Sequence, residues 1–155
     1  MGKVLVAYFS ASGTTARAAR EVASATGGEL FEIAPREPYT AADLDWRNSR
    51  SRSSVEMNDP ACRPELAGGV PDVSGYDAVL LGFPIWWYVE PRVVDTFVEA
   101  AGLAGVPVVP FATSGGSGIG GAERSLAEKY PEVDWRPGAL LNATNVADWA
   151  RGLGL

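Results

Sequence analysis

The sequence predicts an α/β fold in which helices cover both faces of a parallel β-sheet. Apolar runs alternate with segments of helical periodicity along most of the chain, which is the pattern of consecutive βαβ units. The apolar runs are continuous rather than interrupted by polar residues, as expected for parallel strands buried on both faces. With 155 residues, of which 46% are hydrophobic, we expect a single domain over residues 1–155 with a substantial core.

The first half of the chain predicts two strands and one helix. Lys3–Phe9 (KVLVAYF) is a continuous apolar run and the first expected strand. Thr15–Ala25 has alanine and valine at helical spacing, and Gly27-Gly28 ends this helix. Glu29–Ile33 is short and follows directly, so we expect the second strand there.

The second half repeats the alternation of strand and helix. We expect strands at Asp77–Phe83 and Val106–Ala112, each followed by a helix. The first of these helices has Pro91 in its first turn, and the second is stopped by Pro131. The expected helices are Arg92–Ala101 and Ala122–Tyr130. Two short strands are then expected, at Val133–Trp135 and Ala139–Leu141. The last expected element is the helix Val146–Leu153, capped by Thr144 or Asn145.

A long polar segment, Ala34–Asp72, separates the second strand from the third. It is rich in proline, serine, arginine and aspartate, and it has too few apolar residues to form a core of its own. We therefore interpret residues 34–72 as a solvated insertion within the one domain, with a polar helix expected over Asp45–Met57.

Composition excludes several kinds of site. The chain has no histidine and a single cysteine, Cys62, which rules out Ser-His-Asp triads, internal disulfides and thiolate metal clusters. The net charge of −6 disfavours nucleic acids and anionic membranes as partners. No apolar run approaches the roughly 20 residues of a membrane span. We expect a cytoplasmic protein with no metal site, no membrane contact and no bound nucleic acid.

Ligands of such sheets bind outside the carboxyl ends of the strands, where three loops stand out. The first is SASGTT, in which hydroxyls surround Gly13 between a strand and a helix N-terminus. Hydroxyls and free backbone N–H groups at the positive end of a helix dipole form an anion site. We interpret the loop as a phosphate site rather than four helix caps, and it lacks the lysine of a Walker A loop. Its hydroxyls belong to Ser10, Ser12, Thr14 and Thr15.

The second loop, PIWWYVEP, carries Trp86 and Trp87 at the end of a buried strand. Two adjacent indoles cannot both point inward from an extended segment, so at least one must face a cleft or solvent. Large flat side chains at a cleft mouth suit a large flat ligand. The alternative is that one indole packs against the polar insertion.

The third loop contains G-x-G-x-x-G, formed by Gly116, Gly118 and Gly121. This spacing is the dinucleotide fingerprint, and Glu132 or Asp134 is near the distance expected for a ribose-binding acid. That fingerprint normally follows the first strand, however, where SASGTT already stands. Glycines also let a backbone lie flush against a flat ring and offer N–H donors to it. The three loops together then predict one ligand with a phosphate tail and a flat tricyclic ring, which is FMN.

Three stretches in this order, YFSASGTT, YDAVLLGFPIWWYVEP and VPFATSGGSGIG, resemble the motifs of short-chain flavodoxins, and the resemblance covers nearly the whole chain. It implies a flavodoxin-like three-layer sandwich with a five-stranded parallel sheet of order 2-1-3-4-5. It also implies FMN as the cofactor. The phosphate would be held by Ser10, Ser12, Gly13, Thr14 and Thr15, and the ring would lie between Pro84, Ile85, Trp86 and Trp87 on one side and Thr113, Ser114, Gly115, Gly116 and Ser117 on the other.

The resemblance implies a low-potential electron carrier that moves electrons between redox partner proteins, a reductase and an acceptor, with basic docking surfaces. With neither histidine nor cysteine in the three loops, we expect no catalytic residue, because the cofactor carries the chemistry. Backbone N–H groups of the third loop are expected to stabilise charge on the ring. Glu90 or Asp59 is expected to lower the potential by disfavouring the anionic reduced flavin.

The main alternative is an FMN-dependent reductase of quinones or nitro compounds that draws hydride from NAD(P)H. It would share the three loops and need a pocket over the flavin, which the insertion and its arginines could supply. A phospho-receiver domain shares the sheet but needs acids where this chain has Phe9-Ser10 and Gly82-Phe83. A scaffold that has lost its cofactor is disfavoured because the loop chemistry is intact.

The loop before the ring departs from the flavodoxin pattern. Phe83–Pro91 contains no glycine, asparagine or aspartate, the residues that reach positive φ most easily. A left-handed conformation of Ile, Trp or Tyr costs on the order of 1–2 kcal/mol. We therefore expect this loop to adapt less readily to the half-reduced flavin, and the chain to be less strictly committed to one-electron transfer.

Overall fold

The computed structural model describes residues 3–141 and 146–154, in which the strands form one parallel sheet. The strand order is β2-β1-β3-β4-β5, as the resemblance implied. A further short strand, β6, also pairs with β4 in parallel, so two short strands share the edge position beside β4. The strands are β1 (Val4–Tyr8), β2 (Glu29–Glu32), β3 (Ala78–Pro84), β4 (Pro107–Thr113), β5 (Asp134–Trp135) and β6 (Ala139–Leu140).

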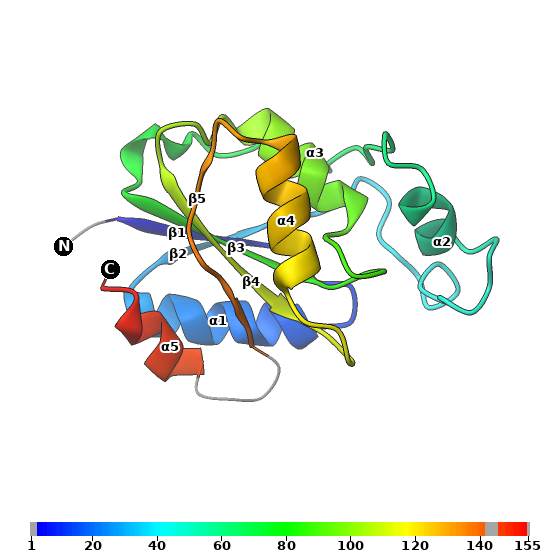
Figure 1. Ribbon diagram of the computed structural model, residues 1–155, viewed down its shortest axis with the longest axis horizontal. Helices are drawn as coiled ribbons and strands as arrows, with labels where there is room; N and C mark the ends of the chain where they lie inside the picture. Colours follow the sequence, from blue (N-terminus) through cyan, green and yellow to red (C-terminus); the bar gives the residue numbers. More distant parts are fainter. Residues whose placement is uncertain (1–2, 142–145, 155) are drawn as a thin grey trace.

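Helices cover both faces of the sheet and make three layers (Figure 1). On one face, α1 and α5 bury small apolar side chains such as Ala19 and Ala150 against the sheet. On the other face, α3 and α4 bury larger ones, Phe97 and Leu126 among them. The helices are α1 (Thr14–Thr26), α2 (Arg52–Met57), α3 (Arg92–Ala101), α4 (Gly120–Lys129) and α5 (Val146–Gly152), with a 3-10 turn at Val73–Gly75.

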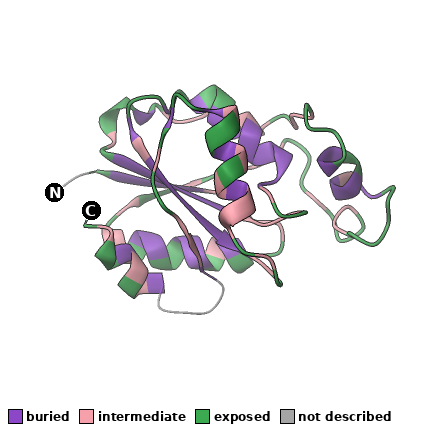
Figure 2. Cartoon of the chain, in the orientation of Figure 1, coloured by how far each residue is buried: buried purple, intermediate pink, exposed green. Residues whose placement is uncertain are grey.

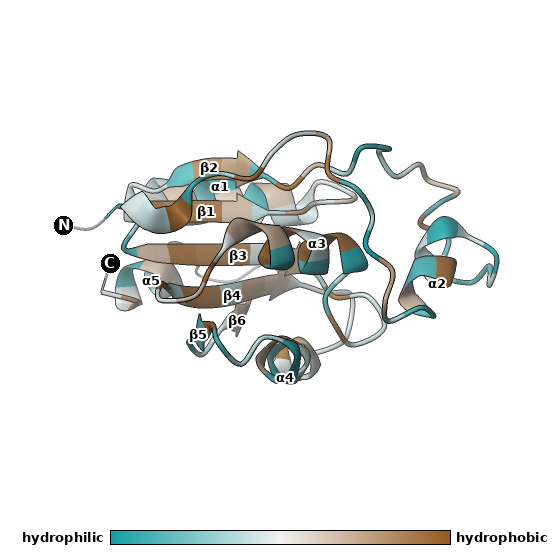
Figure 3. Cartoon of the chain, turned by 90° about the horizontal axis from the view of Figure 1, so that it is seen from above, coloured by the Kyte–Doolittle hydropathy of each residue, from teal (hydrophilic) through white to brown (hydrophobic). Residues whose placement is uncertain are grey.

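The core follows from the strand sequences. In β3, Val79, Leu81 and Phe83 belong to the cluster under α3 and α4, whereas Leu80 belongs to the cluster under α1 and α5. The central strands are therefore buried on both faces, as their continuous apolar runs predicted (Figure 2). Figure 3 shows the same strands as the most hydrophobic part of the fold. Among the described residues, no helix is both long and apolar enough to cross a bilayer.

The polar helix expected over Asp45–Met57 is wrong in its first half, because only Arg52–Met57 is helical. The side chains of Asp45 and Asn48 accept hydrogen bonds from the backbone N–H groups of Arg47 and Arg50, at 3.2 and 3.0 Å. Such local bonds offer the backbone an alternative to a helix. The expected caps of the last helix, Thr144 and Asn145, lie outside the described residues.

The insertion is anchored to the domain, and only part of it is solvated. The α2 helix stands beyond the carboxyl ends of the strands in both views of the chain (Figures 1 and 3). The guanidinium of Arg92, at the start of α3, donates to the carbonyl oxygens of Glu56 and Met57 at 3.3 and 2.9 Å. The ring of Tyr39 packs edge-on against Phe9, with centroids 5.5 Å apart. These contacts fix α2 beside the end of the sheet where the three loops meet.

Candidate functional site

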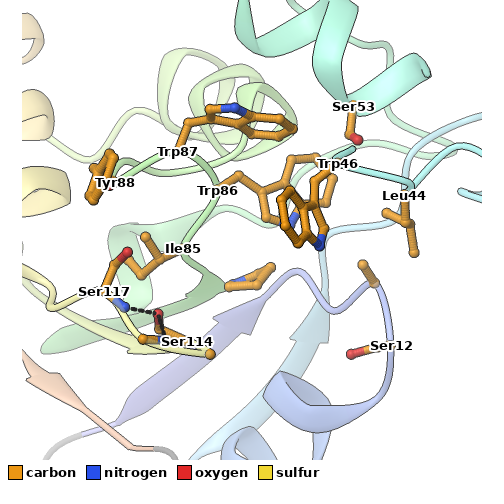
Figure 4. A pocket seen from close by; sticks show the side chains of 14 residues that line it. Ser12, Leu44, Trp46, Ser53, Ile85, Trp86, Trp87, Tyr88, Ser114 and Ser117 are labelled. Carbon is orange, nitrogen blue, oxygen red and sulfur yellow. Dashed lines mark hydrogen bonds between the residues drawn. The ribbon is translucent and has the colours of Figure 1, made fainter. Parts of the chain in front are cut away.

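A cavity of about 660 Å³ lies at the carboxyl ends of β1, β3 and β4 (Figure 4). This volume is within the range of about 300–1,000 Å³ that is usual for small-molecule sites. The structure brings together here parts of all three loops that the sequence singled out. The predicted site residues that line the cavity are Ser12, Pro84, Ile85, Trp86, Trp87, Ser114, Gly115, Gly116 and Ser117. Those that do not line it are Ser10, Gly13, Thr14, Thr15 and Thr113.

The first loop leaves the N-terminus of α1 open. Gly13 precedes the helix with a φ of 98°, a left-handed conformation that glycine reaches without strain. The Ser10 hydroxyl accepts from the Gly13 N–H at 3.0 Å, so it does not cap the first turn. In the described structure nothing accepts from the N–H groups of residues 14–16. Because Ser12 and Thr14 are also exposed, this end of α1 offers free donors of the kind that can bind an anion.

Thr15 connects the first loop to the third. Its hydroxyl oxygen lies 2.8 Å from that of Thr113, and one of the two donates a hydrogen bond to the other. Both residues are buried, Thr15 at 1% exposure and Thr113 at 4%. Thr15 was expected to bind phosphate. In this structure its hydroxyl is paired with that of Thr113, so its backbone N–H is the group that it offers to a ligand.

The third loop is shaped by Ser114. Its hydroxyl oxygen accepts from the N–H groups of Gly116 and Ser117 at 3.1 and 2.8 Å. Two of the N–H groups that were expected to face a ring therefore already have an acceptor. A Cβ added to Gly115 or Gly116 would meet no atom within 4 Å, so both glycines leave open space beside the cavity.

The last glycine of G-x-G-x-x-G has a packing role. Gly121 lies in the first turn of α4, where an added Cβ would fall 2.4 Å from the carbonyl oxygen of Tyr88. Any larger residue there must push the backbone of the second loop away. The spacing that resembles a dinucleotide fingerprint thus includes one glycine selected by close contact between α4 and that loop.

The second loop is a tight turn from Trp86 to Val89. The backbone N–H of each of these two residues donates to the carbonyl oxygen of the other, at 3.0 and 3.1 Å. Trp87 and Tyr88 between them have φ values of 47° and 72°, as in a two-residue type I′ turn, which normally selects Asn-Gly. Positive φ is therefore adopted here by tryptophan and tyrosine, and not by the residue types that reach it most easily. The loop instead holds a strain of about 1–2 kcal/mol at each of the two positions.

The two adjacent indoles have different surroundings. The ring of Trp86 packs edge-on against Phe9 and Tyr39, with centroid distances of 5.7 and 5.3 Å. Trp87 is 44% exposed and Tyr88 is 71% exposed, and all three residues from Trp86 to Tyr88 line the cavity. Trp87 is therefore open to solvent, as the sequence predicted for at least one indole, while Trp86 contacts the insertion, which was the alternative.

A buried charged cluster follows this turn. Glu90 and Asp95 are fully buried, and the ammonium of Lys129 on α4 lies 2.7 Å from Glu90 Oε2 and 2.9 Å from Asp95 Oδ1. The Ser125 hydroxyl also donates to Glu90 Oε2 at 3.3 Å. Burial, followed by the nearby Asp95 carboxylate, raises the pKa of Glu90 to about 7, although Lys129 acts in the opposite direction.

Neither acid that was expected to act on the flavin lines the cavity. Glu90 lies beneath the turn, paired with Lys129. Asp59 follows α2, where its carboxylate accepts from the N–H of Ala61 at 3.0 Å. The local structure therefore gives these two carboxylates other partners.

The chain is similar to known proteins over nearly its whole length. A family model described as flavodoxin matches residues 3–152. The chain belongs to the flavodoxin family. A search of curated proteins finds no match.

Solved structures agree with this family membership. One such structure is a protein of Bacteroides eggerthii DSM 20697 that is described only as a flavoprotein. It is 51% identical to this chain, with a TM-score of 0.95, and the match covers 100% of this chain and 99% of the other. A flavoprotein of Lactobacillus acidophilus NCFM, crystallised in complex with FMN, is 22% identical, with a TM-score of 0.76, over 97% and 99% of the two chains. Flavodoxin 1 of Bacillus cereus is 18% identical, with a TM-score of 0.53, over 98% and 94%. The last two likenesses show a shared fold.

Sequence reasoning missed one wall of the cavity in this flavodoxin. Leu44, Trp46 and Ser53 come from the insertion, and they line the cavity together with Ala11 and Tyr88. A tryptophan within an otherwise polar segment was a usable signal for Trp46. No pattern in the sequence distinguishes Ser53 from the neighbouring serines.

Proposed function

We propose that this flavodoxin binds FMN and carries electrons at low potential between redox partner proteins in the cytoplasm. The observation that supports the proposal is a single cavity whose borders differ in chemistry. One border adjoins the open N-terminus of α1, and the others carry indoles and a glycine-rich loop. FMN, the cofactor that the sequence predicted, has both a phosphate and a flat ring, and it agrees with the family to which the chain belongs.

The residues present suit each part of this cofactor. The N–H groups of residues 14–16 and the hydroxyls of Ser12 and Thr14 would hold the phosphate. Charge-assisted hydrogen bonds of this kind are about twice as strong as neutral ones. The flat ring would lie between the Trp86–Val89 turn and the loop from Ser114 to Ser117, both of which line the cavity.

The cofactor supplies the redox chemistry when it is bound, and the chain supplies position and electrostatics. Trp86 and Trp87 place apolar surface in the cavity, which would shield a bound ring from water. The net charge of −6 disfavours any additional negative charge in the site. This is the property that a low-potential carrier requires.

The same net charge suits transient contact with basic surfaces on a reductase and on an acceptor. Complementary charge raises the rate of encounter more than it raises affinity. Because salt screens exposed charges beyond about 8–10 Å, electron transfer to such a partner is expected to slow as the ionic strength rises.

The experiment that tests the proposal is the absorption spectrum of the purified protein, together with identification of the cofactor that acid releases. A yellow protein that releases FMN supports it, whereas a protein that takes up no FMN contradicts it. Steady-state oxidation of NAD(P)H, measured with and without a quinone, then separates a carrier from a reductase. A carrier oxidises NAD(P)H only when a partner reductase is added.

A further inference from the structure

The cavity extends beyond the three flavodoxin loops onto the insertion. Leu44, Trp46 and Ser53 form this part of its lining, which we call the insertion wall. In the view of Figure 4, Ser53 and Trp46 lie at the end of the cavity opposite Ser114 and Ser117. The phosphate and ring sites proposed above use none of these three residues, so the insertion wall is available to a second ligand.

Ser53 presents an unused hydroxyl to the cavity. The residue is only 2% exposed, and its Oγ has no hydrogen-bond partner anywhere in the described parts of the chain. Buried polar groups without a partner are rare in native structures, and each one calls for an explanation. A ligand oxygen that accepts from this hydroxyl would provide its missing partner.

Trp46 presents a flat apolar surface beside this hydroxyl. Its side chain is 69% exposed, which is unusual for the largest aromatic residue. The guanidinium of Arg47 lies 5.5 Å from the centroid of its ring, within the range of a cation–π contact. An exposed indole that lines a cavity is suited to stack against a flat ring.

The insertion wall is held in place rather than free to move away. The N–H of Ser53 donates to the carbonyl oxygen of Asp43 at 2.9 Å. The guanidinium of Arg52 lies 3.9 Å from the centroid of the Tyr39 ring and donates to Glu56 Oε2 at 2.9 Å. Tyr39 in turn packs against Trp86 of the second loop. A wall fixed in this way loses little conformational freedom when a ligand binds.

We propose that the insertion wall binds a small planar ring that bears a carbonyl group, next to the flavin. The Ser53 hydroxyl donates to the carbonyl oxygen, and Trp46 covers one face of the ring. The inference rests on the proposed function, because the rest of the cavity is assigned to FMN. Quinones and the nicotinamide head of NAD(P)H share this chemistry.

Isothermal titration of the oxidised, FMN-loaded protein tests this assignment, with menadione as the quinone and NAD⁺ as the dinucleotide. Neither probe is reduced by an oxidised cofactor, so the measurement reports binding alone. We expect one of the two probes to bind, and Ser53→Ala and Trp46→Ala each to weaken it on the order of tenfold. FMN affinity, measured separately on the cofactor-free protein, is expected to fall much less. The probe that binds identifies the class of ligand.

Val55→Ala is the matched control, because Val55 lies in the same helix, is 55% exposed and does not line the cavity. It should leave the affinity for the probe unchanged, and far-UV circular dichroism verifies that all variants fold. Three results would overturn the inference: neither probe binds, the probe binds equally well to all variants, or FMN affinity falls as much as probe affinity. A protein that fails to bind FMN at all would instead refute the proposed function.

Discussion

Gly121 lies so close to the backbone of Tyr88 that an added Cβ would fall 2.4 Å from its carbonyl oxygen. This contact joins the first turn of α4 to the turn that carries Trp87. Tyr88 is also the residue of this turn that adopts a left-handed conformation with a φ of 72°. The strained turn therefore packs directly against α4, with no room for a side chain at position 121.

Replacing Gly121 with alanine should displace the turn. We expect Gly121→Ala to lower the free energy of unfolding by about 1–3 kcal/mol, the usual cost of overpacking, and to weaken FMN because Trp87 and Tyr88 line the cavity. Urea denaturation and fluorimetric titration with FMN measure the two effects. Gly118→Ala is the control from the same motif, because its added Cβ would meet no atom within 4 Å. Equal effects of the two changes would contradict the contact.

The phosphate site predicts a difference between FMN and riboflavin, which lacks the phosphate. We expect the double change of Ser12→Ala and Thr14→Ala to weaken FMN far more than riboflavin. Each lost hydrogen bond to a charged group contributes roughly 1.5–3 kcal/mol. Dissociation constants of both ligands, from quenching of flavin fluorescence, check this. Equal losses for the two ligands would mean that the loop does not touch the phosphate.

The glycine-rich loop is expected to contact the ring and not a dinucleotide. Gly116→Val fits the fold, since nothing lies within 4 Å of an added Cβ, but its side chain occupies space at the cavity wall. We expect it to weaken FMN by at least tenfold, on the order of 1.4 kcal/mol, and to leave the folding transition nearly unchanged. Tight binding of NAD by the FMN-free protein, abolished by this change, would restore the pyrophosphate interpretation.

The positive φ of Tyr88 can be tested through stability. Glycine adopts this conformation without strain, whereas alanine retains the penalty of a Cβ. We therefore expect Tyr88→Gly to be more stable than Tyr88→Ala by about 1 kcal/mol in the FMN-free protein, although glycine usually lowers stability. Because Tyr88 is 71% exposed, loss of its ring contributes little to either variant. Thermal unfolding compares the two, and a Tyr88→Ala protein as stable as Tyr88→Gly would argue against the left-handed turn.

The buried Glu90 makes stability depend on pH. Its pKa rises from 4.5 to about 7 on folding, so the folded protein holds this proton more tightly than the unfolded chain does. The stabilising contribution is fully present below pH 4.5 and is lost as the pH rises to about 7, by up to about 3 kcal/mol. Glu90→Gln should remove this decline from the free energy of unfolding measured between pH 4.5 and 8.

The charged groups that face Glu90 are Asp95 from α3 and Lys129 from α4. The amide of glutamine can still accept from Lys129. Glu132→Gln serves as the control, because Glu132 is exposed before β5. It should show the same decline with pH as the native chain. A Glu90→Gln protein with an unchanged decline would place the titrating proton on another group.

The sheet and two sides of the cavity were predictable because local sequence determines them. The continuous apolar runs of β1, β3 and β4 predicted buried parallel strands to within a residue or two at each end. Parallel strands place their carboxyl ends at one edge, so the loops that follow them had to meet. Residues as far apart as Ser12, Trp86 and Ser114 were therefore expected at one cavity, where the structure places them.

The insertion wall and the strained turn were not predictable, because contacts between distant parts of the chain determine them. The path of the insertion depends on Tyr39 against Phe9 and on Arg92 bonded to Met57, and none of these pairs leaves a periodic pattern. At Trp87 the local preference fails for a different reason. Tryptophan disfavours positive φ, yet the surrounding structure places it there. Hydrogen bonds across the turn and the contact at Gly121 impose it.

The hydroxyl pair of Thr15 and Thr113 joins residues 98 positions apart in the sequence. It ties the start of α1, where a phosphate would bind, to the end of β4, where a ring would lie. The separation between these two subsites is therefore set before any ligand arrives. The distance between the phosphate subsite and the ring subsite is therefore constant. A ligand whose tail is too short or too long can fill one of the two subsites but not both.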